Sequence, residues 1–238
     1  MHILDLLWNV RPALSVSVMS ANLMSLGADI LQLENNDVRL LHFDVMDGHF
    51  VPLLTAGPLF VKGVTTTMLK DVHLMIDNPF EAIPLYAAAG ADIITVHVES
   101  GIHVRSSLQR IGKLKNANAE ERGIARGIAI NPSTPLQAIE PLLEETDIAT
   151  LVAINPGFPG QTFYWDTVVR AEKVRGMIAQ TGKNILLCID GGVTLENCGE
   201  IGSMKPDIVV SGSAVFENNA VVKNLDMMRR SLRGEQQS

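Results

Sequence analysis

Eight short runs of apolar and β-branched residues recur along the 238-residue chain at intervals of about 30 residues, the length of one strand plus its connecting helix. Runs such as Ile-Ile-Thr-Val and Ile-Val-Val are apolar or β-branched at every position, which is typical of parallel strands buried on both faces. Strands are therefore expected at 13–19, 40–46, 70–75, 92–98, 127–131, 148–155, 185–190 and 207–211.

The longer stretches between these runs predict helices at 22–33, 57–67, 79–89, 104–115, 135–143, 165–180, 195–201 and 220–232. Such alternation indicates an α/β protein, and the even length of the units favours a single (β/α)8 TIM barrel. The main alternative is an open doubly wound sheet, but no GxGxxG motif follows the first strand. One barrel domain is expected over residues 1–238, with 229–238 as a flexible tail.

Charge and composition narrow the class of protein further. The net charge of −7 argues against a nucleic-acid partner, and a hydrophobic content of 47% allows a large core. Cys188 and Cys198 have no metal-binding spacing, which favours two reduced thiols. The chain has no run of 18 apolar residues and no basic, then apolar leader, so we expect no membrane partner and a cytoplasmic location.

Four polar side chains lie where predicted strands end. His42 and Asp44 are two positions apart, so in a strand they point to the same face. His73 ends another strand, and Asp190 ends a third. Because the carboxyl ends of barrel strands meet at one mouth, these residues are expected to form a cluster of two imidazoles and two carboxylates, which suits one divalent metal ion.

This set of residues favours proton abstraction next to a carbonyl group. A divalent cation stabilises the negative charge that develops on the substrate oxygens. Two carboxylates on opposite faces of the substrate can remove a proton from one side and return one from the other, which inverts a stereocentre. Imidazole and carboxylate ligands suit zinc, iron(II), manganese or cobalt and do not choose among them.

Glycine-rich segments follow the last three predicted strands. They are Asn155-Pro156-Gly157-Phe158-Pro159-Gly160-Gln161, then Asp190-Gly191-Gly192, then Val210-Ser211-Gly212-Ser213-Ala214. In barrels, the loops after the seventh and eighth strands commonly hold a phosphate, and glycine lets backbone N–H groups approach its oxygens. The sequence therefore predicts a phosphorylated ligand at this side of the mouth.

The motifs His-Phe-Asp-Val-Met-Asp-Gly-His-Phe-Val-Pro at 42–52 and Asp-Val-His-Leu-Met at 71–75 resemble those of the ribulose-phosphate 3-epimerase family. Asn-Pro-Gly-Phe-Pro-Gly-Gln and Ile-Asp-Gly-Gly-Val follow in the expected order. The resemblance implies a (β/α)8 barrel that binds one divalent metal and inverts carbon 3 of a ketopentose phosphate, most simply between D-ribulose 5-phosphate and D-xylulose 5-phosphate.

The resemblance also implies roles for individual residues. Asp44 and Asp190 correspond to the acid–base pair. The metal ligands correspond to His42, Asp44, His73 and Asp190. The substrate-binding positions correspond to Ser17, His73, Met46, Met75, Gly157, Phe158, Pro159, Gly160, Gly191, Gly192, Gly212 and Ser213.

Several positions depart from the family pattern, and all lie near the expected substrate. Pro159 stands where the family has glycine, and proline has no N–H to donate. Val152 replaces a methionine, and Leu53 and Ala56 replace asparagine and phenylalanine. An allulose 6-phosphate 3-epimerase, or another sugar-phosphate epimerase on this barrel, is therefore the nearest alternative activity.

Two more distant alternatives have different chemistry. A decarboxylase or synthase on the same barrel would need a lysine near the position of His73, whereas Lys70 begins that strand. A barrel that acts only as a regulator is disfavoured by the complete ligand set. His97 and Glu99 are interpreted as structural residues rather than as groups that orient a ligand. The partner is expected to be a small sugar phosphate, and relatives with this barrel suggest a homo-oligomer.

Overall fold

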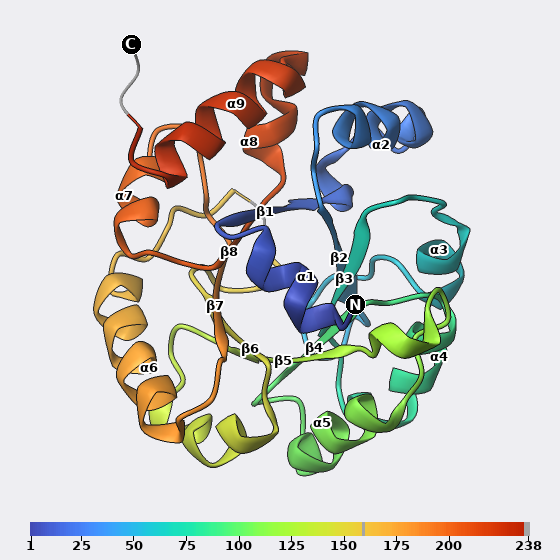
Figure 1. Ribbon diagram of the computed structural model, residues 1–238, viewed down its shortest axis with the longest axis vertical. Helices are drawn as coiled ribbons and strands as arrows, with labels where there is room; N and C mark the ends of the chain where they lie inside the picture. Colours follow the sequence, from blue (N-terminus) through green and yellow to red (C-terminus); the bar gives the residue numbers. More distant parts are fainter. Residues whose placement is uncertain (159, 236–238) are drawn as a thin grey trace.

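The computed structural model describes residues 1–158 and 160–235. Its eight parallel strands form a closed barrel in sequence order, β1 pairing with both β2 and β8 (Figure 1). The strands are β1 Ala13–Ser17, β2 Leu40–Met46, β3 Leu69–Met75, β4 Ile93–His97, β5 Ala125–Ile130, β6 Ile148–Val152, β7 Leu186–Asp190 and β8 Ile208–Ser211. The predicted (β/α)8 barrel is confirmed, with strand ends within a few residues of those expected.

Helices surround the barrel as an outer ring (Figure 1). The α-helices are α1 Ile3–Asn9, α2 Leu26–Asn35, α3 Pro58–Gly63, α4 Ile83–Ala88, α5 Val104–Lys113, α6 Thr167–Thr181, α7 Cys198–Ser203, α8 Ser213–Phe216 and α9 Val221–Leu232. Two of them, α1 and α8, were not among the expected helices. The short 3₁₀ helices are Val18–Ser20, Pro79–Glu81, Glu120–Arg122, Leu136–Ala138, Glu140–Glu145 and Glu217–Asn219.

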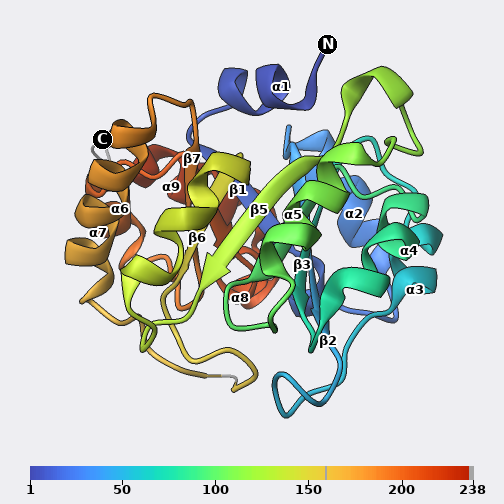
Figure 2. The same ribbon diagram turned by 90° about the horizontal axis from the view of Figure 1, so that it is seen from below.

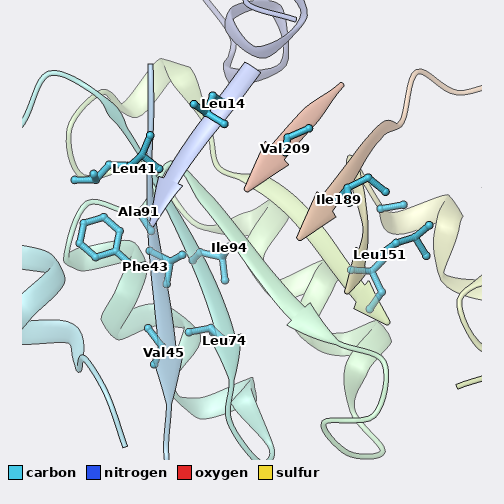
Figure 3. Packing of buried hydrophobic residues seen from close by; sticks show 14 of the residues in the cluster. Leu14, Leu41, Phe43, Val45, Leu74, Ala91, Ile94, Leu151, Ile189 and Val209 are labelled. Carbon is cyan, nitrogen blue, oxygen red and sulfur yellow. The ribbon is translucent and has the colours of Figure 1, made fainter. Parts of the chain in front are cut away.

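The alternation along each strand separates an apolar outer face from a mixed inner face. On β2, Leu41, Phe43 and Val45 point outward and pack under the helices (Figure 3). His42 and Asp44 therefore point into the barrel. In the β2–β3 register, His42 lies beside Asp71 and Asp44 beside His73, so four polar side chains of two strands become neighbours.

Helix α1 closes the end of the barrel at which the strands begin (Figure 2). Its Ile3 and Leu7 are fully buried and pack in a second apolar cluster. The barrel residues of that cluster are Ala13, Leu40, Ile93, Ala125, Ile148, Leu186, Cys188, Ile208 and Val210. Burying a leucine or isoleucine side chain contributes about 1.5–3 kcal/mol to the free energy of folding, so the packing of α1 stabilises this end of the barrel. The opposite end, where the strands finish, is left for the loops and the polar residues.

Two expectations about local structure were wrong. The helix expected at 135–143 consists of two 3₁₀ helices, because Pro135 and Pro141 lack the N–H groups that a continuous α-helix needs. The tail expected at 229–238 begins too early, since α9 runs to Leu232, whose side chain is buried, and residues 236–238 lie outside the described residues. Arg229 also donates a hydrogen bond to the backbone oxygen of Asn36, which fixes this turn of α9 against the end of α2.

Candidate active site at the carboxyl ends of the strands

Three strands bring the four predicted metal ligands together. His42 and Asp44 come from β2, His73 from β3, and Asp190 from the last position of β7. One ligand atom from each of the four residues lies within 4.8 Å of the others. Both histidines are almost fully buried, while the carboxylates are partly open to the mouth. Residues far apart in the sequence therefore surround a common point.

The imidazole of His42 is oriented by Asp71. Its Nδ1 lies 2.8 Å from Asp71 Oδ2, and the same oxygen accepts a hydrogen bond of 2.8 Å from the hydroxyl of Ser15. Nε2 is then directed to the cluster, 3.2 Å from Asp44 Oδ1 and 3.9 Å from Asp190 Oδ2. A carboxylate behind a histidine is a common arrangement in metal sites, because it fixes which nitrogen is free for the metal.

In residues 1–158 and 160–235, one ring nitrogen of His73 accepts or donates no hydrogen bond. Its Nδ1 lies 3.0 Å from Asp190 Oδ2, an ion-pair distance, but this buried atom has no hydrogen-bond partner among the described residues. A buried polar atom without a partner is costly, and a divalent cation next to it would satisfy it. The residues present therefore fit a metal ion bound by two nitrogens and two carboxylate oxygens.

The charges in the cluster are coupled. Burial alone would lower the pKa of His42, but the carboxylates of Asp71 and Asp44 outweigh it and raise that pKa well above its ordinary value. Burial would likewise raise the pKa of Asp44, yet the charge and hydrogen bond of His42 hold it well below its usual range, with help from His73 and Ser17. Without a cation, the cluster is thus stabilised by an imidazolium next to an ionised Asp44.

A cavity of about 370 Å³ lies over the cluster at the mouth of the barrel. Almost all of the predicted substrate and catalytic residues line it: Ser17, Asp44, Met46, His73, Met75, Gly157, Phe158, Gly160, Asp190, Gly191, Gly192, Gly212 and Ser213. His42 does not, since it lies beneath the cavity floor and lines a much smaller space inside the barrel. Pro159 lies outside the described residues.

The loops after β7 and β8 bring free backbone donors to one side of this cavity. In the described part of the chain, the N–H groups of Gly191, Gly192, Gly212 and Ser213 donate to no other protein group. Gly191 and Gly192 have φ angles of +99° and +69°, which side chains other than glycine rarely adopt. A Cβ atom on Gly192 would also lie 2.9 Å from the backbone of Phe163. These loops suit an anionic group better than an apolar one.

Four residues of the site were not assigned to it from the sequence. Ser15 and Asp71 orient His42. His97 and Glu99, which were interpreted as structural, form a chain of hydrogen bonds that begins at His73. Burial lowers the pKa of His97 to about 4, although Glu99 acts in the opposite direction. The available signal was spacing: Asp71 and His73, and also His97 and Glu99, repeat the two-residue separation of His42 and Asp44.

The fold and the cluster define a (β/α)8-barrel protein with a metal-capable cleft at the carboxyl ends of its strands. The model of the ribulose-phosphate 3 epimerase family matches residues 13–216, and the chain belongs to this family. It is accordingly an isomerase of the carbohydrate-phosphate epimerase type.

Individual relatives agree with this family. The ribulose-phosphate 3-epimerase of Bacillus subtilis (strain 168) is 38% identical over 218 residues, 90% of this chain and 97% of that protein. The enzyme of the same name from Escherichia coli (strain K12) is 39% identical over 221 residues, 91% and 94% of the two chains. Crystalline 3-hexulose-6-phosphate synthase from Salmonella typhimurium has a TM-score of 0.67 at 17% identity, covering 94% of this chain and 100% of that one, a likeness of fold.

Among residues 1–158 and 160–235, no helix is both long enough and apolar enough to cross a bilayer.

Proposed function

We propose that this protein interconverts D-ribulose 5-phosphate and D-xylulose 5-phosphate through a 2,3-enediolate. The observation that carries the proposal is the convergence of Asp44 and Asp190 with two buried imidazoles at the floor of the mouth cavity. The names of the curated relatives support the pentose phosphate as substrate. Inversion at carbon 3 needs one acid–base group on each face of the sugar, and the cluster offers two carboxylates from different strands.

Four residues would hold the metal ion: His42, Asp44, His73 and Asp190. When bound there, a divalent cation supplies Lewis-acid stabilisation of the negative charge that develops on the substrate oxygens. Zinc, iron(II), manganese and cobalt all suit this mixture of nitrogen and oxygen ligands.

Asp44 is ionised and is oriented by a neighbouring hydroxyl group. The hydroxyl of Ser17 donates a 2.8 Å hydrogen bond to its Oδ2, and its pKa is held low, so the carboxylate is ionised at neutral pH. In one direction Asp44 removes the proton from carbon 3 and Asp190 returns a proton to the other face. In the reverse direction the two aspartates exchange these tasks, as the reversibility of an epimerisation requires.

The rest of the cavity would bind the two ends of the substrate. Met46 and Met75 provide apolar contacts near the reacting carbons, where excluding water strengthens the electrostatic interactions. The free N–H groups after β7 and β8 are suitable donors for the phosphate oxygens. An anionic sugar phosphate would thus lie with its carbonyl end over the cluster and its phosphate at the glycine loops.

A hexulose phosphate is a second candidate substrate. Val152, which replaces a methionine of the family pattern, lines the cavity together with Leu53. Valine is shorter than methionine, so this side of the cavity offers space for one more carbon. Allulose 6-phosphate 3-epimerisation would use the same aspartates and the same phosphate loops.

A panel of ketopentose and ketohexose phosphates tests the proposal. The enzyme is assayed after removal of metal with a chelator and again after restoring zinc, iron(II), manganese or cobalt. We expect epimerisation of ribulose 5-phosphate only with metal restored. Full activity of the metal-free enzyme would contradict the proposed metal site. A higher kcat/KM for a ketohexose phosphate would show that the hexulose phosphate, not the pentulose phosphate, is the preferred substrate. Cytoplasmic location and a homo-oligomer remain proposals, tested by cell fractionation and light scattering.

A further inference from the structure

We infer that Glu99 and His97 form a hydrogen-bond relay that fixes the tautomer of His73, so that the Nδ1 lone pair of His73 faces the metal. The inference rests on the proposed metal site and concerns two residues outside the ligand set. It assigns to both a positioning role, because neither reaches the substrate cavity.

The relay runs from the end of β4 to the ligand on β3. His73 Nε2 lies 2.9 Å from His97 Nε2, and His97 Nδ1 lies 3.1 Å from Glu99 Oε2. The two imidazole planes are nearly parallel, differing by 7°, and the ring centroids lie 4.9 Å apart. Both rings are buried, and the ring of Phe50 covers His97 at a centroid distance of 4.9 Å. Water therefore has little access to the hydrogen bond between the two rings.

Counting protons gives a single arrangement of donors. Glu99 is a carboxylate and can only accept, so His97 must carry its proton on Nδ1. A neutral His97 then has an unprotonated Nε2, which accepts from His73. His73 consequently carries its proton on Nε2 and leaves Nδ1 bare, at the position where the metal is expected. If His97 donated to His73 instead, the proton of His73 would occupy Nδ1 and block the ligand position.

Glu99 itself is held in place. Its second oxygen, Oε1, accepts a 2.9 Å hydrogen bond from the backbone N–H of Asn131. Arg170 in turn donates to the backbone oxygens of Asn131 and Thr134, each at 3.0 Å, and so fixes the loop after β5. The two oxygens of the Glu99 carboxylate thus have separate and fixed partners.

This arrangement makes Glu99→Gln an informative substitution. The amide oxygen of glutamine would take the place of Oε1, because only an acceptor can face the N–H of Asn131. The amide NH₂ would then face Nδ1 of His97 and donate to it. His97 would hold its proton on Nε2, His73 would accept there, and the proton of His73 would move to Nδ1. Replacing one carboxylate oxygen of Glu99 with an NH₂ group thus reverses the direction of the hydrogen bonds in the relay while a side chain of the same size is kept.

Zinc affinity, measured by competition with a chromogenic chelator, tests the relay. Groups that orient a ligand typically change metal affinity by 10–100-fold, and we expect a loss in this range for Glu99→Gln. The matched control is Glu34→Gln on α2, whose carboxylate accepts hydrogen bonds from Thr66 and Thr67 far from the cluster. Zinc affinity of Glu99→Gln within twofold of that control would overturn the inference. Failure of the wild-type protein to bind zinc would instead reject the proposed metal site.

A measurement on the wild-type protein keeps the inference testable if Glu99→Gln does not fold. In the zinc-loaded protein with ¹⁵N-labelled histidine, two-bond ¹H–¹⁵N correlations report which ring nitrogen carries a proton. We expect protonated Nε2 in His73 and protonated Nδ1 in His97. A proton on Nε2 of His97 would overturn the relay, whatever the affinity of any variant.

Discussion

The two ends of this barrel are built from the same eight strands and have opposite characters. At the end where the strands begin, Leu40, Ile93 and Ile148 point inward and pack on Ile3 and Leu7 of α1. At the end where they finish, the inward positions carry imidazoles and carboxylates under an open cavity. Moving two residues along β2, from Leu40 to His42, changes the inner face from apolar to ionisable.

The difference indicates how the chain separates stability from chemistry. A cluster of buried ionisable groups is expensive, because burial opposes every charge that lacks a partner. The apolar end and the outer layer provide the favourable burial that offsets this cost. A substitution at one end should therefore affect activity with little effect on folding, and the reverse should hold at the other end.

The largest expected effect comes from Asp44→Asn at the open end. The amide can neither accept nor return a carbon 3 proton, so interconversion of the two epimers, and proton exchange with deuterated water in the epimer that Asp44 deprotonates, should fall by about 10³-fold or more. The protein should still fold, because Ser17 can donate to the amide oxygen and the apolar packing of the barrel is unchanged. Exchange is followed by NMR of the ketose phosphate with the metal-loaded enzyme.

Asp207→Asn is the matched control at the closed end. Asp207 pairs with Arg11 at 3.0 Å and accepts from the backbone of Leu187, so its loss should lower stability and leave exchange intact. Retained exchange of both epimers in Asp44→Asn, or equal losses in Asp44→Asn and Asp207→Asn, would contradict the acid–base assignment.

Leu7→Ala should have the next largest effect, on stability alone. Leu7 is fully buried between α1 and the barrel, and truncating such a leucine costs about 2–4 kcal/mol of unfolding free energy. Leu59→Ala, at a position that is 85% exposed, should cost no more than about 0.5 kcal/mol. Urea denaturation measures both. A drop in kcat of folded Leu7→Ala comparable to the drop in Asp44→Asn would refute the separation of the two ends.

The sequence predicted the strands well and the closed end poorly. Parallel strands are recognisable because they are apolar on both faces, as in Ile208–Val210. Helix α1 was missed because its seven residues gain stability only from packing on the barrel end where the strands begin. That burial depends on tertiary structure, and no local pattern encodes it.

Within the site, the sequence predicted the four ligands but not the residues behind them. His42, Asp44, His73 and Asp190 stand out because each ends an apolar run. The contact of Asp71 with His42 depends instead on the β2–β3 register, which places these residues side by side. The contact of His97 with His73 depends on ring orientation as well, so spacing alone could not separate it from a structural role.

In the metal-free protein, the stabilisation contributed by an ionisable group should change with pH in opposite directions at the two ends of the barrel. The folded pKa of His42 lies well above the unfolded value of about 6.5. Its contribution to stability is therefore fully present below about pH 6.5 and is lost as the pH rises through the raised folded value. The difference in unfolding free energy between wild type and His42→Gln should be larger at pH 6 than at pH 9. A difference that grows with pH would mean that His42 is not held as an imidazolium.

Glu34, at the closed end, should give the smallest effect and the opposite sign. The backbone N–H of Thr67 and the hydroxyl of Thr66 lower its pKa by donating to the carboxylate. Its contribution is present above about pH 4.3 and is lost as the pH falls through the lowered folded value. Because the side chain is partly exposed and screened, Glu34→Gln should cost only about 0.5 kcal/mol at pH 7.

That small cost should shrink further at pH 3, where the carboxylate of the wild-type protein begins to bind a proton. Turnover and zinc affinity of Glu34→Gln should equal those of the wild type, because Thr66 and Thr67 join α2 to the start of β3 and not to its end. Urea denaturation at both pH values, combined with chelator competition, measures these quantities. A loss of zinc affinity in this variant would show that the two ends are coupled through β3, and the comparison between them would then fail.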